Sequence, residues 1–410
     1  MPLTSFTYSI PYLGLLLYYV ALAFLEFRAK KYDTDTKYIR WAAMAGFIFF
    51  FGLRGFVFSD WELYYALFEK ISTIWDGGLK SVLSQDFTED FATDVNLGKT
   101  GYEMGFIYFT VLFKSIIPDY FAWVFFNTVL DVLLLNVFFK RYSPYYALSF
   151  IIFITLGGTM IECNLMRNVK SILFFLFSLK YLQERRILPY MLINIAGVLF
   201  HSSSVVFFPL YFFLHRECPK WLMWAIFIVG VLLTLLQISY LQPLMISFAD
   251  IVGGRLGVQI KLYFASEFYS RSYGISLGLI ERIITYLLLI FFKKKLVERN
   301  PGNIMFINAY LLYFVVFFYF SEIWVAVDRL SLLFVFTYWI LYPELLALVE
   351  NVYKRLVVLL VMVAFCSMKI ITMNSNIFSK YDNLLFGIES IEKRSQIVYN
   401  ELDNYVDSKK

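Results

Sequence analysis

The sequence has few of the residues from which metal sites and disulfide frameworks are built. It contains 3 cysteines and 2 histidines in 410 residues. The cysteines, Cys163, Cys218 and Cys366, lie far apart and show no ligand spacing. This distribution argues against a disulfide framework and against a cysteine-based metal site. The sequence also has no glycine-rich phosphate loop and no Cys/His cluster. We therefore expect no metal and no other cofactor.

Charged residues are scarce as well, at 16% of the chain, whereas soluble domains average about 25%. The net charge of +5 is ordinary for a membrane protein with basic cytoplasmic loops. A nucleic-acid partner is therefore not predicted.

Hydrophobic residues make up 60% of the chain and aromatic residues 21%, and the mean hydropathy is +0.67. The apolar residues form repeated continuous runs of about 18–20 residues, which is the length that crosses a bilayer as a helix. The predicted fold is an all-α polytopic integral membrane protein with about 11–13 transmembrane helices. The candidate spans are 8–27, 39–58, 102–117, 120–139, 145–161, 165–182, 187–214, 221–240, 275–292, 303–320, 328–349 and 355–373.

Two of these spans need comment. The first has no basic segment before it and no small-residue cleavage site after it, so we read it as a retained span rather than a signal peptide. The stretch 187–214 is too long for one simple crossing and is interrupted by "HSSS" and Pro209. It is either a long broken helix or two short helical segments.

Charge bias predicts the orientation of the chain. Segment 28–40 carries five basic residues, whereas segment 59–101 carries eight acids and three lysines. The first is expected in the cytoplasm and the second outside, as is segment 241–274. Residues 1–373 then form one transmembrane domain, followed by a tail, 374–410, that contributes no chemistry. The side assignments require an odd number of crossings between 102 and 139, so 102–117 is either a span or re-entrant.

The stretch "FGLRGFVFSDWELYY" (51–65) places a cation and an anion where a hydrophobic run ends. Ser59 and Glu62 have capping-box spacing, which predicts a helix at the outer interface with Asp60 in its first turn. Gly52 and Gly55 flank Arg54 and leave room for a close approach.

Several ionisable residues fall near the outer ends of the predicted spans, where an uncompensated charge is costly unless it faces a cavity or a partner. Arginine binds phosphate oxygens through paired hydrogen bonds and stays charged. A carboxylate or an imidazole can take a proton from an attacking hydroxyl. This combination fits the transfer of a sugar from a lipid diphosphate. The residues are Arg54, Asp60, Glu103, Arg167, His201 and Arg329.

The order of motifs along the chain resembles that of the EpsG family of Wzy-type polysaccharide polymerases. The motifs are "LRGFVFSDWELY", "GYEMGFIYFTVLFK", "NLMRNVKSILFFLFSLKYLQERR", "VLFHSSSVVFFPLYFF" and "DRLSLLF". The Arg, Asp and Tyr of the family pattern are matched by Arg54, Asp60 and Tyr64. Its Glu-x-Gly motif is matched by Glu103 and Gly105.

Two further motifs continue the likeness. Leu165 and Arg167 match the start of a family helix, and Phe200, His201 and Ser202 match the family's Phe-His-Ser. The resemblance implies metal-independent polymerisation of undecaprenyl-diphosphate-linked oligosaccharide repeat units at the outer face of the bacterial cytoplasmic (inner) membrane. It also implies a scaffold similar to that of the C-type glycosyltransferases. A chain-length regulator and a flippase are further candidate partners.

Candidate roles follow for nine residues. The predicted catalytic residues are His201, Asp60 and Glu103; the predicted diphosphate ligands are Arg54, Arg167, Arg329 and Arg282; the predicted sugar-binding residues are Tyr64 and Tyr102. Two alternatives remain open at this level. One is a flippase or transporter of lipid-linked oligosaccharides, although no pair of matching broken helices is seen. The other is a membrane acyltransferase of surface glycans.

Overall fold

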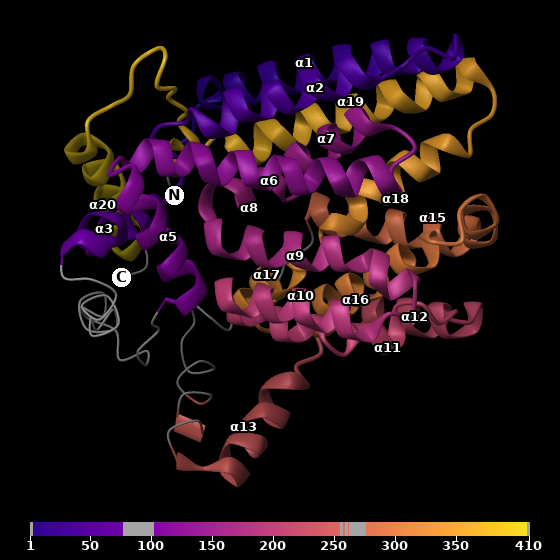
Figure 1. Cartoon of the computed structure of the whole chain (residues 1–410). Coiled ribbons are helices and arrows are strands. Elements are labelled where there is room, and N and C mark those ends of the chain that lie inside the picture. Colours follow the sequence, from indigo (N-terminus) through magenta and orange to yellow (C-terminus); the bar gives the residue numbers. More distant parts are fainter. Residues whose placement is uncertain (1–2, 77–101, 255–256, 259–260, 262–275, 408–410) are drawn as a thin grey trace. The chain divides into compact units, whose positions relative to one another are not determined.

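The computed structural model describes residues 3–76, 102–254, 257–258, 261 and 276–407 (Figure 1). This part of the chain contains 18 α-helices and no strand. The protein is therefore an all-α polytopic membrane protein, as the hydrophobic runs predict. The chain divides into two compact units. The first comprises Met1–Phe91, Thr100–Phe208 and Tyr342–Lys410, and the second comprises Ala92–Lys99 and Pro209–Leu341.

Three helices of the first unit are long and apolar enough to cross a bilayer: α1 (Phe6–Lys31), α6 (Tyr120–Tyr142) and α19 (Val352–Asn374). The pair α7 (Tyr146–Thr155) and α8 (Gly158–Asn164) meets the same test as one span bent by 68°. The bend falls at Gly157, whose φ of +80° is a left-handed conformation that glycine adopts without strain.

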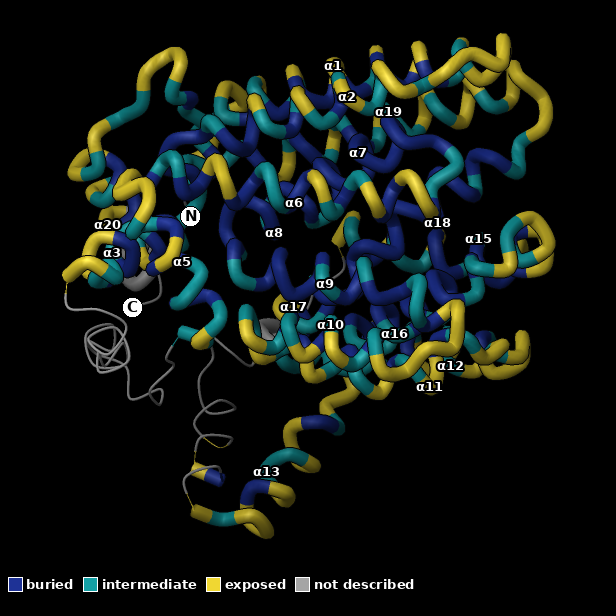
Figure 2. Tube along the Cα trace, in the orientation of Figure 1, coloured by how far each residue is buried: buried dark blue, intermediate teal, exposed yellow. Residues whose placement is uncertain are grey.

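The first unit also contains shorter elements, some of which lie within the predicted spans. Helix α2 continues into a π-helical turn, and α9 packs along α10 (Figure 1). Figure 2 shows the most continuous burial along α7 and α8, whereas α19 is largely exposed, as suits a helix that faces lipid. These elements are α2 (Lys37–Phe47), η1 (Ile48–Gly52), α3 (Trp61–Lys70), η2 (Ile74–Asp76), α5 (Met104–Ile116), α9 (Met166–Gln183), α10 (Ile187–Phe200), η3 (Ser202–Phe207), η4 (Ile377–Ser379) and α20 (Ile391–Asp407).

The second unit is a separate group of helices. The Tyr286 hydroxyl donates to the Met223 carbonyl at 2.8 Å, and the Thr234 hydroxyl donates to the Phe318 carbonyl at 3.1 Å. These bonds join the three helices predicted at 221–240, 275–292 and 303–320. The elements are α11 (Leu210–Phe213), α12 (Lys220–Leu235), α13 (Leu241–Val252), α15 (Leu277–Arg299), α16 (Asn303–Tyr319) and α17 (Trp324–Leu332), and α18 (Phe336–Ala347) extends past the boundary of this unit.

The basic connections of the first unit gather at one end of its helices. Lys30 donates to the Pro144 carbonyl, and Arg141 lies 3.9 Å from Glu184. The Glu26 carboxylate accepts from the amide of Tyr146 at 2.8 Å. Segments 28–40, 140–146 and 183–186 therefore share one side, and the first of them is the basic segment that is expected in the cytoplasm.

Helix α5 does not cross to the basic end. It has 13 residues, or about 20 Å of helix, too short for a bilayer core of about 30 Å. At its C-terminal end, the Lys114 ammonium donates to the carbonyls of Phe68 and Ile71 at 2.6 and 3.0 Å. Figure 1 shows α3, α5 and α20 together at the Tyr120 end of α6. The length and contacts of α5 favour the re-entrant alternative for 102–117, in which α6 supplies the single crossing that the charge bias requires.

The predicted capping box at Ser59 is wrong. Helix α3 begins at Trp61, with Asp60 as its N-cap residue and no side-chain capping bond. The amides of Ser59 and Asp60 instead donate to the side chain of Asn164, at 3.1 and 2.8 Å. An acceptor from a distant helix thus takes the Ser59 amide, which the capping box would pair with the Glu62 carboxylate.

The long stretch 187–214 consists of two helical segments. Helix α10 ends at Phe200, and His201 has extended backbone angles. The chain then turns back, so that the Tyr190 hydroxyl donates to the Phe207 carbonyl at 2.6 Å, and the Phe207 ring stacks on Phe175 at 4.1 Å. This turn leaves His201 at the end of the unit that is opposite the basic one.

The C-terminal segment folds back onto the stretch that precedes α3. The amide of Phe58 donates to the Phe378 carbonyl at 2.7 Å, and the amide of Gly55 donates to the Asp382 carbonyl at 2.9 Å. The amide of Leu384 in turn donates to Leu53 at 2.8 Å. Although its sequence is charged, the start of this tail is an integral part of the first unit.

Candidate active site

An ion pair between Glu103 and Arg167 forms the centre of the candidate site. Nη1 of Arg167 donates to Oε2 of Glu103 at 2.7 Å, and the other carboxylate oxygen accepts from the amide of Ser202 at 2.9 Å. Glu103 precedes α5, Arg167 lies in the first turn of α9, and Ser202 follows α10. One carboxylate thus joins three segments that are far apart in the sequence, and the predicted residues Glu103, Arg167 and His201 lie together.

His201 caps the turn that follows α10. Its Nδ1 accepts from the amide of Ser203 at 3.2 Å and lies 2.7 Å from the Ser203 hydroxyl. That hydroxyl also donates to Oδ1 of Asn168 on α9, at 3.3 Å. Because Nδ1 accepts an N–H, the neutral ring carries its proton on Nε2. His201 therefore presents a hydrogen-bond donor in its neutral form.

Two tyrosines enclose the guanidinium of Arg167. Its Cζ lies 4.8 Å from the centre of the Tyr102 ring, and its charge acts on the buried Tyr64 hydroxyl. Burial raises the pKa of Tyr102 to about 12 and raises that of Tyr64 further. Both hydroxyls are neutral at physiological pH. The predicted sugar-binding tyrosines thus lie beside the ion pair.

Asp60 borders the same group of residues. Burial is the main cause of the raised pKa values of Tyr64 and Tyr102, and the negative charge of Asp60 raises both further. Its side chain is half-buried and accepts from the Ser59 hydroxyl at 3.3 Å. Asp60 is therefore a further carboxylate at the border of the candidate site.

The charge state of Glu103 follows from its partners. Burial raises the pKa of its carboxyl, but the Ser202 amide and the Arg167 guanidinium outweigh this effect and leave the pKa below its ordinary value. A carboxylate with a lowered pKa is a weak base at neutral pH. The geometry suits Glu103 to orient Arg167 and the His201 turn.

We expect the stabilising effect of Glu103 to depend on pH. Because its pKa is lower in the folded state than in the unfolded chain, the ionised pair stabilises the fold above the unfolded pKa of about 4.3. This contribution is lost as the pH falls through the folded pKa. The difference in unfolding free energy between the wild type and Glu103→Gln, measured in detergent, should be largest near neutral pH and should shrink in acid. A difference that does not vary with pH would show that the carboxylate charge has no such role.

Gly105 allows α5 to pack closely on α10. A Cβ at this position would lie 2.6 Å from the carbonyl oxygen of Leu199 and 2.7 Å from its Cβ. Both are well inside van der Waals contact, and the carbonyl belongs to the helix backbone, which cannot rotate away. This gives the Glu-x-Gly motif a physical reason: the glycine brings α5 near enough for Glu103 to reach Ser202.

We predict that Gly105→Ala displaces α5 and costs about 1–3 kcal/mol of stability, the usual penalty for overpacking. Gly14→Ala is the matched control, since a Cβ at Gly14 on α1 meets no atom within 4 Å. The control should be neutral or slightly stabilising, because alanine favours helix more than glycine does. Thermal unfolding of both variants in detergent tests the prediction, and equal melting temperatures would contradict it.

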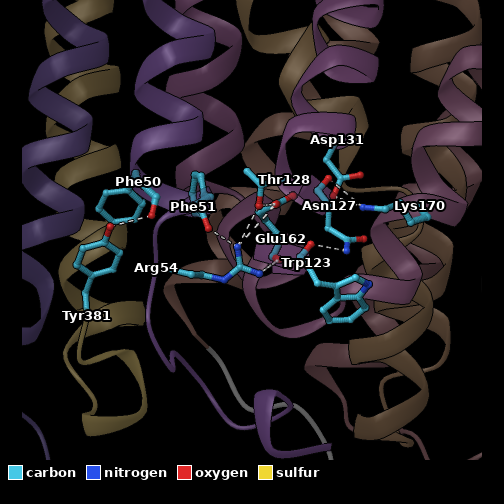
Figure 3. A network of polar contacts seen from close by, with 10 residues as sticks. All are labelled: Phe50, Phe51, Arg54, Trp123, Asn127, Thr128, Asp131, Glu162, Lys170 and Tyr381. Atoms are coloured by element: carbon cyan, nitrogen blue, oxygen red, sulfur yellow. Dashed lines mark hydrogen bonds and ion pairs between the residues drawn. The ribbon is translucent and has the colours of Figure 1, made fainter. Parts of the chain in front are cut away.

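Arg54 belongs to a different network, which Figure 3 shows. It is 4% exposed and donates to the carbonyl of Phe51, to the hydroxyl of Thr128 at 3.2 Å and to the carbonyl of Glu162 at 3.1 Å. Its guanidinium also lies 4.0 Å from the Glu162 carboxylate. All of these partners belong to the protein itself, and none of them belongs to the Glu103–Arg167 group.

A second buried pair lies nearby in Figure 3. Lys170 on α9 donates to the carboxylate of Asp131 on α6 at 2.5 Å. This bond ties α6 to α9, the helix that carries Arg167.

Arg282 and Arg329, the other predicted diphosphate ligands, belong to the second unit. Nε of Arg282 donates to the Tyr313 hydroxyl at 2.8 Å, and its Cζ lies 3.8 Å from the centre of the Phe317 ring. Arg329 is exposed near the end of α17. Their proposed roles remain predictions.

Asn164 is the polar residue near the site that sequence reasoning missed. It is 5% exposed, ends α8, and accepts the two backbone amides that precede α3. The feature of the sequence that indicates it is an asparagine three residues before Arg167, at the break between two helices. Among the described residues, no group of three or more His, Cys, Asp or Glu side chains is arranged to hold a metal.

The comparison with known proteins gives one match. The family model for the EpsG family matches residues 37–383, a range that includes every residue of the candidate site. No curated protein matches the chain, and no solved structure matches it.

Proposed function

We propose, from the premise that this chain belongs to the EpsG family, that it polymerises oligosaccharide repeat units linked to undecaprenyl diphosphate. Family membership implies a polysaccharide polymerase-like function and a glycosyltransferase-like enzyme. The finer assignment, a metal-independent polymerase of the Wzy type with a scaffold similar to that of the C-type glycosyltransferases, is our proposal.

The observation that carries the proposal is the Arg167–Glu103 pair at the end of the membrane helices. The Arg167 side chain is 26% exposed, and its bond to Glu103 uses one of the five N–H donors of the guanidinium. Arg167 also lies in the first turn of an 18-residue helix, where the helix dipole favours anions. These features suit a group that binds a diphosphate and stabilises its charge as it leaves.

The proposed reaction is one glycosyl transfer. A hydroxyl of the acceptor sugar attacks the anomeric carbon of the donor, and the bond from that carbon to the diphosphate oxygen breaks. The bonding electron pair leaves with the diphosphate, whose charge Arg167 offsets. Asp60 takes the proton of the acceptor hydroxyl, and His201 donates a hydrogen bond from Nε2. Tyr64 and Tyr102 provide the aromatic surface beside the sugar.

The lipid substrate explains the membrane scaffold. A polyprenyl chain remains in the bilayer while its diphosphate reaches the interface, where the candidate site lies opposite the basic end of the first unit. We assign that site to the outer face of the bacterial cytoplasmic membrane, because basic segments mark the cytoplasmic side. A flippase would supply the substrate from the cytoplasmic leaflet, and a chain-length regulator would act on the product.

Deletion of the gene tests this function. Surface glycan from the deletion strain, resolved on a gel, should contain single repeat units in place of a ladder, and wild-type protein should restore the ladder. Loss of all surface glycan would instead indicate a flippase. A ladder of full length that lacks acyl groups would indicate an acyltransferase.

A further inference from the structure

We infer that Asn164 and Arg54 are positioning residues that fix Asp60 relative to Arg167. They attach the segment from Arg54 to Asp60 at two points on α8, the helix that leads into α9. The inference deepens the proposed function, on which the role of Asp60 rests. It also gives Arg54 a role other than the diphosphate binding that its sequence context suggests.

The first attachment is at the end of the segment. A single side-chain oxygen of Asn164 accepts the amides of both Ser59 and Asp60, at 3.1 and 2.8 Å. Asn164 is the last residue of α8, Leu165 has non-helical backbone angles, and Arg167 follows in the first turn of α9. The break between α8 and α9, which sets the position of Arg167, therefore also holds the backbone of Asp60.

The second attachment is at the start of the segment. Nη2 of Arg54 donates to the backbone carbonyl of Glu162, two residues before Asn164, at 3.1 Å. Nη1 of Arg54 donates to Thr128 at 3.2 Å, and the Thr128 hydroxyl donates to the Glu162 carboxylate at 2.9 Å. Arg54 and Glu162 are 4% and 2% exposed, so solvent does not compete for these bonds.

The flanking glycines agree with a positioning role. A Cβ at Gly55 would lie 2.8 Å from the Ile388 side chain, and a Cβ at Gly52 would lie 3.1 Å from the Phe125 ring. The space beside Arg54 is thus filled by the protein's own side chains. Phe56 and Val57, between the two attachment points, are also buried, which leaves the segment little freedom once both points are fixed.

Loss of one attachment should displace Asp60 without removing its carboxylate. A base displaced by about 1 Å can cost about a hundredfold in rate. We therefore expect Asn164→Ala to lower kcat by about tenfold to a hundredfold while KM for the lipid-linked donor stays close to that of the wild type, because Arg167 is unchanged.

Hydrogen exchange tests the attachment directly and needs no activity. In purified full-length protein, Asn164→Ala should speed exchange of the Ser59 and Asp60 amides, whereas Asn164→Asp, which keeps an oxygen in place, should leave it slow. Asn136→Ala is the control, since Asn136 accepts from the Tyr146 hydroxyl and does not contact the segment. Unchanged exchange at residues 59 and 60 in Asn164→Ala would overturn the inference, even if the protein proved not to be a polymerase.

A double-mutant cycle tests whether Asn164 acts through Asp60. If it does, adding Asn164→Ala to Asp60→Asn should cause no further loss of polymerisation rate, because the effects of a residue and its positioning partner do not add. If the fold losses in rate of the two single variants multiply in the double variant, the inference is overturned and the polymerase function remains intact. Full activity of Asp60→Asn would likewise overturn it, because there would be no catalytic carboxylate to position.

Discussion

Replacement of Arg167 by alanine should lower the rate of chain growth by about a hundredfold to a thousandfold, the usual cost of removing a group that stabilises transition-state charge. Arg167→Lys keeps the positive charge but loses the planar pair of donors that matches phosphate oxygens. Each lost charge-assisted hydrogen bond is worth about 1.5–3 kcal/mol, so the lysine variant should lose about tenfold to a hundredfold. The measurement is the rate of polymer formation at equal amounts of protein in the membrane.

The structure supplies a control for a purely structural effect. Arg167→Ala leaves the Glu103 carboxylate, 17% exposed, without its 2.7 Å partner, and this alone can destabilise the fold. Adding Glu103→Gln removes the unpaired charge. If the loss of activity reflects only that charge, the double variant should recover. If Arg167 binds the diphosphate, the double variant should fold better than Arg167→Ala and remain inactive. A full ladder from Arg167→Ala would place the diphosphate-binding group elsewhere.

Two replacements of His201 should separate its role as a cap of the turn from its role as a hydrogen-bond donor in the reaction. His201→Ala removes both the imidazole and the acceptor for the Ser203 amide at 3.2 Å, and loss of a cap costs about 1 kcal/mol. Asparagine is a preferred capping residue, so His201→Asn should keep the turn while it removes Nε2–H. We expect both variants to lose activity by a factor of about 10²–10³, the usual cost of removing one positioned hydrogen-bond donor.

The two histidine variants should differ in stability. His201→Asn should unfold at about the temperature of the wild type, and His201→Ala should unfold earlier. Polymer-ladder gels and thermal unfolding of the same preparations test both parts. Wild-type activity in His201→Asn would mean that the histidine serves only to cap the turn.

The sequence predicts most helices well because membrane thickness sets the length of apolar runs. The run predicted at 120–139 is α6 at Tyr120–Tyr142, and that at 355–373 is α19 at Val352–Asn374. The placement of Glu103, Arg167 and His201 at one end of the first unit agrees with their positions near the outer ends of the predicted spans. These features depend on local composition or on a pattern that extends along the whole chain.

The predictions that differ from the structure share a different cause, which is contact between residues that are far apart in the sequence. The acceptor for the two amides that precede α3 is Asn164, 104 residues from Asp60, and the sequence around Asp60 does not point to it. Arg54 looks like a ligand-binding arginine because two glycines flank it, yet distant side chains fill the space. The 16 residues at 102–117 fit either a short span or a helix across the end of the unit, and only the bonds of Lys114 to Phe68 and Ile71 distinguish the two.

The proposed role of Arg167, held by Glu103, is to stabilise a departing lipid diphosphate during glycan chain growth. Purified protein in liposomes, given repeat units linked to undecaprenyl diphosphate as the sole substrate, tests it most directly when polymer and free undecaprenyl diphosphate are measured together. We predict that wild-type protein yields a ladder, releases one diphosphate lipid for each bond formed, and does so with a chelator present, whereas Arg167→Ala yields neither product. Movement of intact substrate between leaflets by the wild type, without release of undecaprenyl diphosphate, would contradict this role.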